Sequence, residues 1–258
     1  MEQRRTALII GASGGIGLAA ALELAGRGVR VAIAARAGER LERAASVLRD
    51  AQPEGLAFAA DVADADDRRS LFERVDAELG RLDILVNSVP GAEPASFLEH
   101  GIHHIEEGIR KKLLPYLDAM KLASDRMRTR RWGRIVNVVG NMWKEPDPLR
   151  YNFGIVNAAI VNASKAAAFE LAPYGITVNG VHPGSILTDR LRSVWADAAE
   201  RRGVTVETVA QGAAAGVPAG RVGTPEEAAA VIAFLASEEA GYVTGQQISV
   251  DGGSMRSM

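Results

Sequence analysis

The sequence predicts an α/β protein built on one doubly wound parallel sheet of about seven strands, with helices on both faces. Three observations lead to this Rossmann-type fold class. Short β-branched and apolar runs alternate with longer amphipathic runs along the chain, which is the pattern of repeated strand–helix–strand units. The first unit carries a glycine-rich turn between its strand and its helix. The 258 residues, 47% of them hydrophobic, are enough to bury a full core.

Seven short runs are predicted to be strands, because each is rich in Val, Ile or Leu and is bounded by glycine or polar residues. They are TALIIGA (6–12), VRVAIAAR (29–36), GLAFAADV (55–62), LDILVNS (82–88), GRIVNVVG (133–140), GITVNGVHPG (175–184) and GQQISVDGG (245–253). Helices are predicted over 15–28, 37–51, 65–80, 102–131, 153–172 and 224–240. The last has Thr224 as N-cap and Pro225 at the first helical position. No linker or repeat interrupts this order, so we expect a single dinucleotide-binding domain over residues 1–258.

Charge and composition exclude several classes of function. With 30 basic and 32 acidic residues, the net charge of −2 gives no field that would attract nucleic acid or a membrane. The basic run RMRTRRWGR (126–134) is interpreted as a solvated helix end. The chain has no cysteine, which excludes disulfides and thiolate sites and fits a reducing compartment. The apolar run near the N-terminus is too short for a signal peptide or membrane span, so we expect a cytoplasmic protein.

The glycine-rich turn GASGGIG (11–17) follows the first predicted strand and begins the first helix. Glycines at such a turn let main-chain N–H groups and the helix N-terminus approach a pyrophosphate. A plain strand–helix turn would also be rich in glycine. The position in the first strand–helix–strand unit favours dinucleotide binding.

This turn, together with DV (61–62), LVNS (85–88), HPG (182–184) and VTGQQISVDGG (243–253), resembles the short-chain dehydrogenase/reductase family over essentially the whole chain. The resemblance implies a small-molecule carbonyl or alcohol substrate and a set of cofactor-binding positions. These are Gly11, Ser13, Gly14, Gly15, Ile16 and Gly17 at the phosphates, Asp61 and Val62 at the adenine, Asn87, and Pro183, Gly184, Ile186 and Thr188 at the nicotinamide. NSVP replaces the family's N-N-A-G, and Ile10 replaces its usual Thr before the glycine turn.

The end of the second strand predicts which cofactor binds. An acidic residue there would accept hydrogen bonds from the 2′-hydroxyl of NAD, whereas an arginine attracts the 2′-phosphate of NADP. The strand ends Ala35-Arg36, which favours NADP(H) over NAD(H). Gly14 stands where many NADP-preferring relatives carry a second basic residue, so this preference rests on Arg36. The alternative is that Arg36 is only a solvated loop charge.

The family's catalytic tetrad of Asn, Ser, Tyr and Lys is missing. Anchoring the alignment on FELAPYGITVNGVHPG puts Phe153 and Asn157 at the Tyr and Lys positions and Gly140 at the Ser position. Counting back along the 102–131 helix puts Lys112 at the Asn position. The alternative alignment, with Lys165 as the lysine, places Val161 where the tyrosine should be, so the tyrosine is absent in either case.

Hydride addition to a carbonyl builds negative charge on oxygen, which the family's tyrosine protonates. Phenylalanine has no proton to give, and removing general acid catalysis costs roughly 10²–10⁴ in rate. Lys112 is a candidate for the positive charge that the family's lysine supplies, relocated to the other side of the same pocket. The alternative is that Lys112 is a surface lysine within RKK. Tyr151 is a second candidate donor, presenting a phenol from the loop, and Asn141, Asn152 and Lys144 lie nearby in the sequence.

Two classes of function remain open. The first is an NADP(H)-dependent oxidoreductase with a rearranged active site, or a non-redox enzyme using the same pocket. The second is a catalytically silent NADP(H)-binding sensor or assembly protein.

The histidines at 100, 103 and 104 match no metal-binding motif, so no metal is expected. By the family resemblance, AAIVNASKAAAF and QQISV supply small and apolar surfaces for a homotetramer or a dimer.

Overall fold

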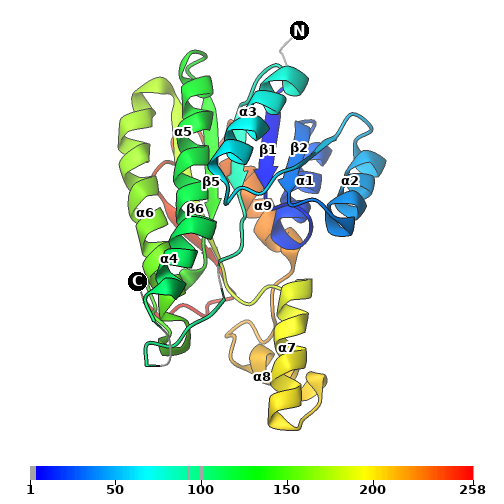
Figure 1. Cartoon of the computed structure of the whole chain (residues 1–258), viewed down its shortest axis with the longest axis vertical. Coiled ribbons are helices and arrows are strands. Elements are labelled where there is room, and N and C mark those ends of the chain that lie inside the picture. Colours follow the sequence, from blue (N-terminus) through cyan, green and yellow to red (C-terminus); the bar gives the residue numbers. More distant parts are fainter. Residues whose placement is uncertain (1–3, 92, 99–100, 258) are drawn as a thin grey trace.

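A single seven-stranded parallel sheet forms the centre of the protein (Figure 1). This computed structural model describes residues 4–91, 93–98 and 101–257; His100 lies outside them. The strands are β1 (Thr6–Ile10), β2 (Arg30–Ala35), β3 (Leu56–Ala59), β4 (Ile84–Asn87), β5 (Gly133–Val138), β6 (Ile176–Pro183) and β7 (Gln247–Val250). Their order across the sheet is β3-β2-β1-β4-β5-β6-β7, and every neighbouring pair is parallel. The predicted fold class is confirmed.

The helices cover both faces of the sheet. They are α1 (Gly15–Gly26), α2 (Glu39–Ala51), α3 (Ala65–Leu79), α4 (His103–Gly108), α5 (Leu114–Arg128), α6 (Tyr151–Leu171), α7 (Asp189–Arg202), α8 (Val206–Ala215) and α9 (Pro225–Leu235). Short 3₁₀ turns η2 (Asn141–Trp143), η3 (Pro148–Arg150) and η4 (Ala172–Tyr174) flank α6. The helix predicted over 102–131 is divided, because a π-helical turn, η1 (Ile109–Leu113), separates α4 from α5. None of these helices is long and apolar enough to span a bilayer, within the described part of the chain.

Alternate residues of the strands pack into two separate hydrophobic cores, one on each face of the sheet. On one face, Ile9, Ile33 and Val136 pack with α1, α2 and α9. On the other, Leu8, Leu85 and other alternate strand residues pack with α3, α5 and α6. Side chains of successive strand residues point to opposite faces of the sheet, and helices cover both faces, so that every residue of such a strand is buried. This explains why the strands read as unbroken apolar segments in the sequence.

Helices α7 and α8 were not predicted, and they form a lobe that projects below the sheet (Figure 1). The α7–α8 lobe (189–215) has its own small core, in which Trp195, Ala199 and Val209 are buried. Thr188 caps α7 by accepting a hydrogen bond from the main-chain N–H of Leu191, at 3.3 Å. The lobe joins the body through a bridge between Ile186 and Gly223. The lobe lies on the side of the sheet toward which the strand arrows point (Figure 1).

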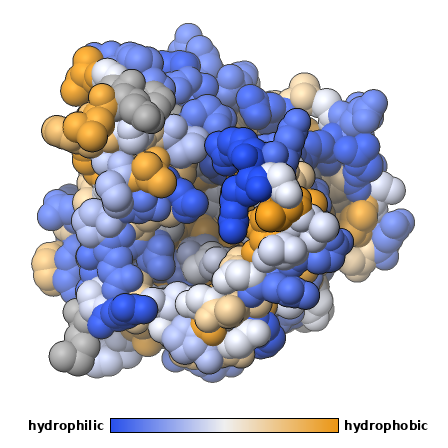
Figure 2. Space-filling model, turned by 90° about the horizontal axis from the view of Figure 1, so that it is seen from below, coloured by the Kyte–Doolittle hydropathy of each residue, from blue (hydrophilic) through white to orange (hydrophobic). Residues whose placement is uncertain are grey.

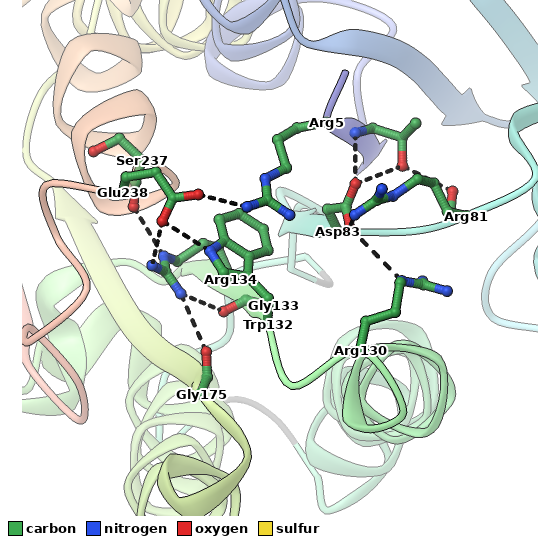
Figure 3. A network of polar contacts seen from close by, with 11 residues as sticks. Arg5, Arg81, Asp83, Arg130, Trp132, Gly133, Arg134, Gly175, Ser237 and Glu238 are labelled. Carbon is green, nitrogen blue, oxygen red and sulfur yellow. Dashed lines mark hydrogen bonds and ion pairs between the residues drawn. The ribbon is translucent and has the colours of Figure 1, made fainter. Parts of the chain in front are cut away.

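Ion pairs lock the opposite end of the sheet, where the strands begin (Figure 3). Asp83 is fully buried; its carboxylate accepts from the N–H of Thr6 at 2.9 Å and pairs with Arg81 at 2.5 Å. Nearby, Glu238 accepts from Nε1 of Trp132 at 2.9 Å and pairs with Arg5 at 2.6 Å. The guanidinium groups of Arg5 and Arg134 lie 3.8 and 4.4 Å from the centroid of Trp132.

The run 126–134 is only in part the solvated helix end that the sequence predicts: Arg128, Arg130 and Arg131 are exposed, whereas Arg134 lies in β5. Arg134 is 3% exposed and donates to the carbonyl of Ser237 at 2.9 Å. This edge lacks the glycine-rich turn and the tetrad positions, so its charges serve stability.

Candidate functional site

The cofactor site is expected where the strand order reverses, between β1 and β4, because a crevice opens there at the carboxyl ends of the strands. Gly11 follows β1 at this point, with a positive φ of 84°. A Cβ on Gly11 would lie 2.5 Å from the carbonyl oxygen of Ser88, which follows β4. Only glycine allows β1 and β4 to approach this closely while the chain turns.

The glycine turn has the geometry of a phosphate cradle. Gly14 is the N-cap of α1, and no side chain caps the helix, so the first N–H groups of α1, from Gly15, Ile16 and Gly17, have no side-chain acceptor. A Cβ on Gly17 would lie 2.5 Å from the carbonyl oxygen of Gly11, which keeps the turn tight. Ser13 belongs to the same turn and is half-buried. Free N–H groups at a helix N-terminus fit a pyrophosphate.

Two arginines flank this turn, and the sequence analysis found only one of them. Arg36 follows the end of β2 and is exposed. Arg40, in the first turn of α2, reaches back to the cradle, since a Cβ on Gly14 would lie 3.3 Å from its Nη2. The guanidinium of Arg40 thus lies beside the phosphate turn. It also faces the carboxylate of Asp189 at 3.7 Å.

The predicted adenine-side residues are held in place by hydrogen bonds from α3. The N–H of Asp61 donates to Asp67 at 2.8 Å, and Arg68 donates to the carbonyl of Val62 at 2.5 Å. Asn87 is buried, and its amide donates to Oδ1 of Asn137 at 2.9 Å. The side chain of Asn87 therefore ties β4 to β5.

The predicted nicotinamide loop runs from the end of β6 to the start of α7. Pro183 ends β6, and the N–H of Gly184 donates to the carbonyl of Val250 at 3.0 Å. Ile186 is buried, and Thr188 approaches the phosphate turn, since a Cβ on Gly15 would lie 3.1 Å from its Cγ2. The loop thus connects the phosphate turn to the α7–α8 lobe.

Three of the four residues predicted to stand at the tetrad positions form one connected group. The ammonium of Lys112 donates to Oδ1 of Asn157 at 3.0 Å, and the amide of Asn157 donates to the carbonyl of Gly140 at 3.1 Å. Lys112 lies on the π-helical turn η1, and such turns are frequent at functional sites. A Cβ on Gly140 would lie 3.3 Å from Nδ2 of Asn157, so glycine leaves room for that amide.

Lys112 is not a surface lysine, which corrects one of the two readings from the sequence. It is 7% exposed, and among the described residues its ammonium donates only to Asn157 and has no carboxylate partner. Burial, helped by the charge of Arg190, lowers the pKa of Lys112 from 10.5 to about 8. A lysine with this pKa titrates close to physiological pH.

The two residues considered from the sequence at or near the tyrosine position, Phe153 and Tyr151, both lie on α6. Phe153 is half-buried, and its ring faces Gly91, on which a Cβ would lie 3.5 Å from Cε1. Tyr151 begins α6 rather than lying in the preceding loop, and its ring packs edge-on against Phe97, with centroids 5.6 Å apart. Two residues along a helix point in nearly opposite directions, so Tyr151 points away from the Phe153 face.

Tyr116 is the phenol that the sequence analysis overlooked. It is fully buried below Lys112, whose Nζ lies 5.6 Å from the centre of the ring. Its hydroxyl donates to the carbonyl of Val138 at 2.7 Å, and burial raises its pKa. Since the hydroxyl proton is already donated to a main-chain carbonyl, we assign Tyr116 a structural role rather than that of a proton donor to a substrate.

An aromatic pair, Trp143 and His182, adjoins the group around Lys112. Their ring centroids are 5.3 Å apart, and His182 contacts the carbonyl of Val139 at 2.6 Å and Gln247 at 2.8 Å. Burial lowers the pKa of His182, and the charges of Lys112 and Lys144 lower it further. The lowered pKa favours the neutral imidazole of His182.

The other polar residues singled out from the sequence have structural partners. Asn152 is buried and fastens the 93–95 segment, because it donates to the carbonyl of Glu93 at 2.8 Å and accepts from the N–H of Ala95 at 3.2 Å. Asn141 begins η2. The rings of His103 and His104 lie 3.9 Å apart, and the described residues contain no group of three possible metal ligands.

Figure 2 shows the end of the molecule toward which the strand arrows of Figure 1 point. The surface is hollowed near its centre. Strongly hydrophilic side chains project over the hollow, and hydrophobic ones lie beside them (Figure 2). A parallel sheet of this topology places its ligands at this end.

The glycine-rich turn after β1 and the strand order are those of a short-chain dehydrogenase/reductase, and the comparisons with known proteins show that the chain belongs to that family. The family model that matches residues 11–255 is described as enoyl-(acyl carrier protein) reductase. The chain is 41% identical over 257 residues to the NADPH-dependent reductase BacG of Bacillus subtilis (strain 168), covering 99% of both chains.

Two solved structures are similar over nearly the whole chain. One is YwfH, described as an NADPH-dependent reductase involved in bacilysin biosynthesis; it has a TM-score of 0.93 and 41% identity, over 99% of this chain and 100% of that one. The other is a variant of actinorhodin polyketide ketoreductase with NADPH, with a TM-score of 0.93 and 30% identity, over 98% of both chains.

Proposed function

We propose that this protein is an NADPH-dependent reductase of a small carbonyl compound, in which the ammonium of Lys112 replaces the missing tyrosine phenol. The observation that carries this proposal is the buried group formed by Lys112, Asn157 and Gly140. Burying an ammonium without a counter-charge is costly. A function for that charge explains why it is buried there.

The choice of cofactor has two independent supports. NADPH dependence is part of the description of the Bacillus relative, and the ketoreductase structure holds NADPH. In this chain, Arg36 and Arg40 flank the phosphate turn, where two cations suit a 2′-phosphate. The pyrophosphate is expected at the N-terminus of α1. When bound, NADPH supplies a hydride from its nicotinamide ring.

In the reaction, the carbonyl carbon receives the hydride, the C=O π bond breaks and negative charge develops on oxygen. The Lys112 ammonium stabilises this oxyanion and gives it a proton, which solvent later restores. With a pKa of about 8, Lys112 is roughly nine-tenths protonated at pH 7. Oδ1 of Asn157 accepts a hydrogen bond from Nζ of Lys112 at 3.0 Å. This bond orients the ammonium and leaves its other two N–H groups for the substrate.

A pH profile combined with one pair of variants tests this role. Lys112→Met should lower kcat by about 10²–10⁴ while NADPH still binds, because it removes the acid and the charge. Lys111→Met is the matched control, since Lys111 is exposed and pairs with Glu107. The wild-type rate should fall as the pH rises above about 8, where Lys112 loses its proton.

Retained turnover in Lys112→Met would exclude this mechanism. The other class of function makes a different prediction: a sensor or assembly protein would bind NADPH but reduce no carbonyl compound. Calorimetry of NADPH binding, run beside the turnover assay, separates these outcomes.

The proposal extends to self-association. Ile155 and Phe169 on α6 are 46% and 71% exposed, and Tyr242 is fully exposed. Large apolar side chains on one helix are typical of an interface between subunits. A homotetramer or a dimer is expected, and light scattering at micromolar concentration measures it.

A further inference from the structure

Side chains hold three consecutive main-chain carbonyls where the chain leaves β5. Each carbonyl meets a different donor: Val138 the hydroxyl of Tyr116 at 2.7 Å, Val139 a ring nitrogen of His182 at 2.6 Å, and Gly140 the amide of Asn157 at 3.1 Å. β5 ends at Val138, so the last two carbonyls lie beyond the strand. The third bond leads directly to Lys112, because Oδ1 of Asn157 accepts from its ammonium at 3.0 Å.

His182 is the member of this set that has no assigned role. It lies in β6 and is fully buried. A carbonyl oxygen only accepts, so the contact of 2.6 Å with Val139 places the ring hydrogen on Nδ1. The indole N–H of Trp143 also approaches Nδ1, at 3.2 Å, but it cannot donate to a nitrogen that already carries a hydrogen. The shorter contact therefore fixes the tautomer.

The other side of the His182 ring is held by Gln247 of β7. The amide of Gln247 lies 2.8 Å from Nε2 of His182, and a Cβ on the neighbouring Gly180 would overlap that amide. With its hydrogen on Nδ1, the neutral ring accepts at Nε2, which requires the amide nitrogen of Gln247 on this side. That orientation also gives the nitrogen a partner, which it otherwise lacks among the described residues.

We propose that His182 is a positioning residue, which sets the direction of the Lys112 ammonium by holding the peptide between Val139 and Gly140. The inference rests on the proposed function. The carbonyl of Val139 and the N–H of Gly140 belong to one planar unit, so a bond to the first fixes the plane from which the chain continues. The next carbonyl, that of Gly140, holds one end of the planar amide of Asn157, and the other end of that amide holds Lys112.

The pKa of Lys112, measured by NMR of protein labelled with ¹³C at lysine Cε, tests the proposal without any substrate. Lys112→Met identifies the resonance. His182→Leu removes both ring nitrogens, so Asn157 loses its alignment and the ammonium loses stabilisation. The pKa of Lys112 should then fall by about 0.5–1 pH unit, a part of what a hydrogen bond to a charged group contributes.

Two amide variants and a control make the test specific to Nδ1. His182→Asn returns an N–H close to the place of Nδ1 and should restore the wild-type pKa of Lys112. His182→Gln, whose amide extends to the place of Nε2, should not restore it. Thr177→Val is the control on the same strand, since Thr177 is buried and its hydroxyl has no partner among the described residues; it should leave this pKa unchanged.

Turnover should follow the same order. His182→Leu and His182→Gln should lower kcat about 10- to 100-fold, as a misplaced catalytic group does, with KM for NADPH unchanged. The double variant His182→Leu, Lys112→Met should be no slower than Lys112→Met alone, because a positioning residue acts only through its target.

A rise in the pKa of Lys112 in His182→Leu would overturn the inference, because it would show that His182 carries a positive charge and acts by repulsion. An unchanged pKa, or a His182→Asn variant that matches His182→Gln, would overturn it too, and this pair decides the question even where the leucine variant does not fold. Retained turnover in Lys112→Met would refute the proposed function alone, since the pKa measurements would still show whether His182 positions Lys112.

Discussion

Replacing Lys112 by methionine should stabilise the protein at neutral pH while it removes activity. An ordinary lysine titrates at 10.5 and the buried Lys112 at about 8, a difference that corresponds to ~3 kcal/mol of unfavourable free energy in the folded state. Methionine has a similar length and no charge to bury. It leaves Oδ1 of Asn157 without its donor, which costs about 1 kcal/mol. The net gain is about 2 kcal/mol, or about 4–8 °C in Tm for a chain of this size.

The gain should depend on pH in a defined direction. Below pH 8 both the folded and the unfolded chain carry the proton, so the full penalty applies. Between pH 8 and 10.5 the unfolded chain holds a proton that the folded chain has released, so wild-type stability rises through this range. The advantage of Lys112→Met should therefore be large near pH 7 and close to zero near about pH 9.5.

Urea unfolding of the wild type, Lys112→Met and Lys111→Met at both pH values measures the effect. Lys111 is exposed, so its variant should match the wild type at each pH. A Lys112→Met variant that is less stable than the wild type at pH 7, or whose advantage does not change with pH, would refute the account of Lys112 as an uncompensated buried cation.

Three further predictions follow from the geometry. Arg40→Ala should weaken NADPH binding about ten-fold and leave NADH binding nearly unchanged, because only NADPH carries the 2′-phosphate; Arg43→Ala, an exposed change on the same helix, is the control in calorimetry. Tyr151→Phe should keep turnover within about two-fold of the wild type, since its ring packs on Phe97; a loss of 10² or more in kcat would identify it as the proton donor. Asp83→Ala should destabilise the fold by about 3–5 kcal/mol in urea unfolding, because it removes a fully buried carboxylate that pairs with Arg81 and accepts from the N–H of Thr6; a smaller loss would mean that this carboxylate contributes less to stability than its burial implies.

The strands of the sheet could be predicted from the sequence, because each is recognisable from a short stretch of consecutive residues. Each strand is a short apolar run, and the structure contains all seven within a few residues of the predicted bounds. The phosphate turn is equally local, since Gly11, Gly14 and Gly17 follow one strand directly. Counting residues along the helices predicted that Lys112, Gly140 and Asn157 share one site, and in the structure hydrogen bonds connect the three.

The features that sequence reasoning missed depend on contacts between distant segments. RKK reads as a charged surface run, whereas Lys112 is buried on the π-helical turn η1. Arg40 reaches Gly14 because of how α2 packs after β2, which no spacing rule encodes. Helices α7 and α8 bury Trp195 and Val209 against each other rather than on the sheet, so their apolar residues do not continue the strand–helix alternation.

The separate core of the α7–α8 lobe has a practical consequence for spectroscopy. The chain contains three tryptophans, and each reports on a different part of the molecule. Trp195 lies in the lobe, Trp143 lies beside His182, and Trp132 lies against two arginines at the far end of the sheet. Variants that keep one indole at a time would give intrinsic fluorophores for the lobe, for the surroundings of His182 and for the far end of the sheet, so that the effect of a ligand on each could be recorded without an added label.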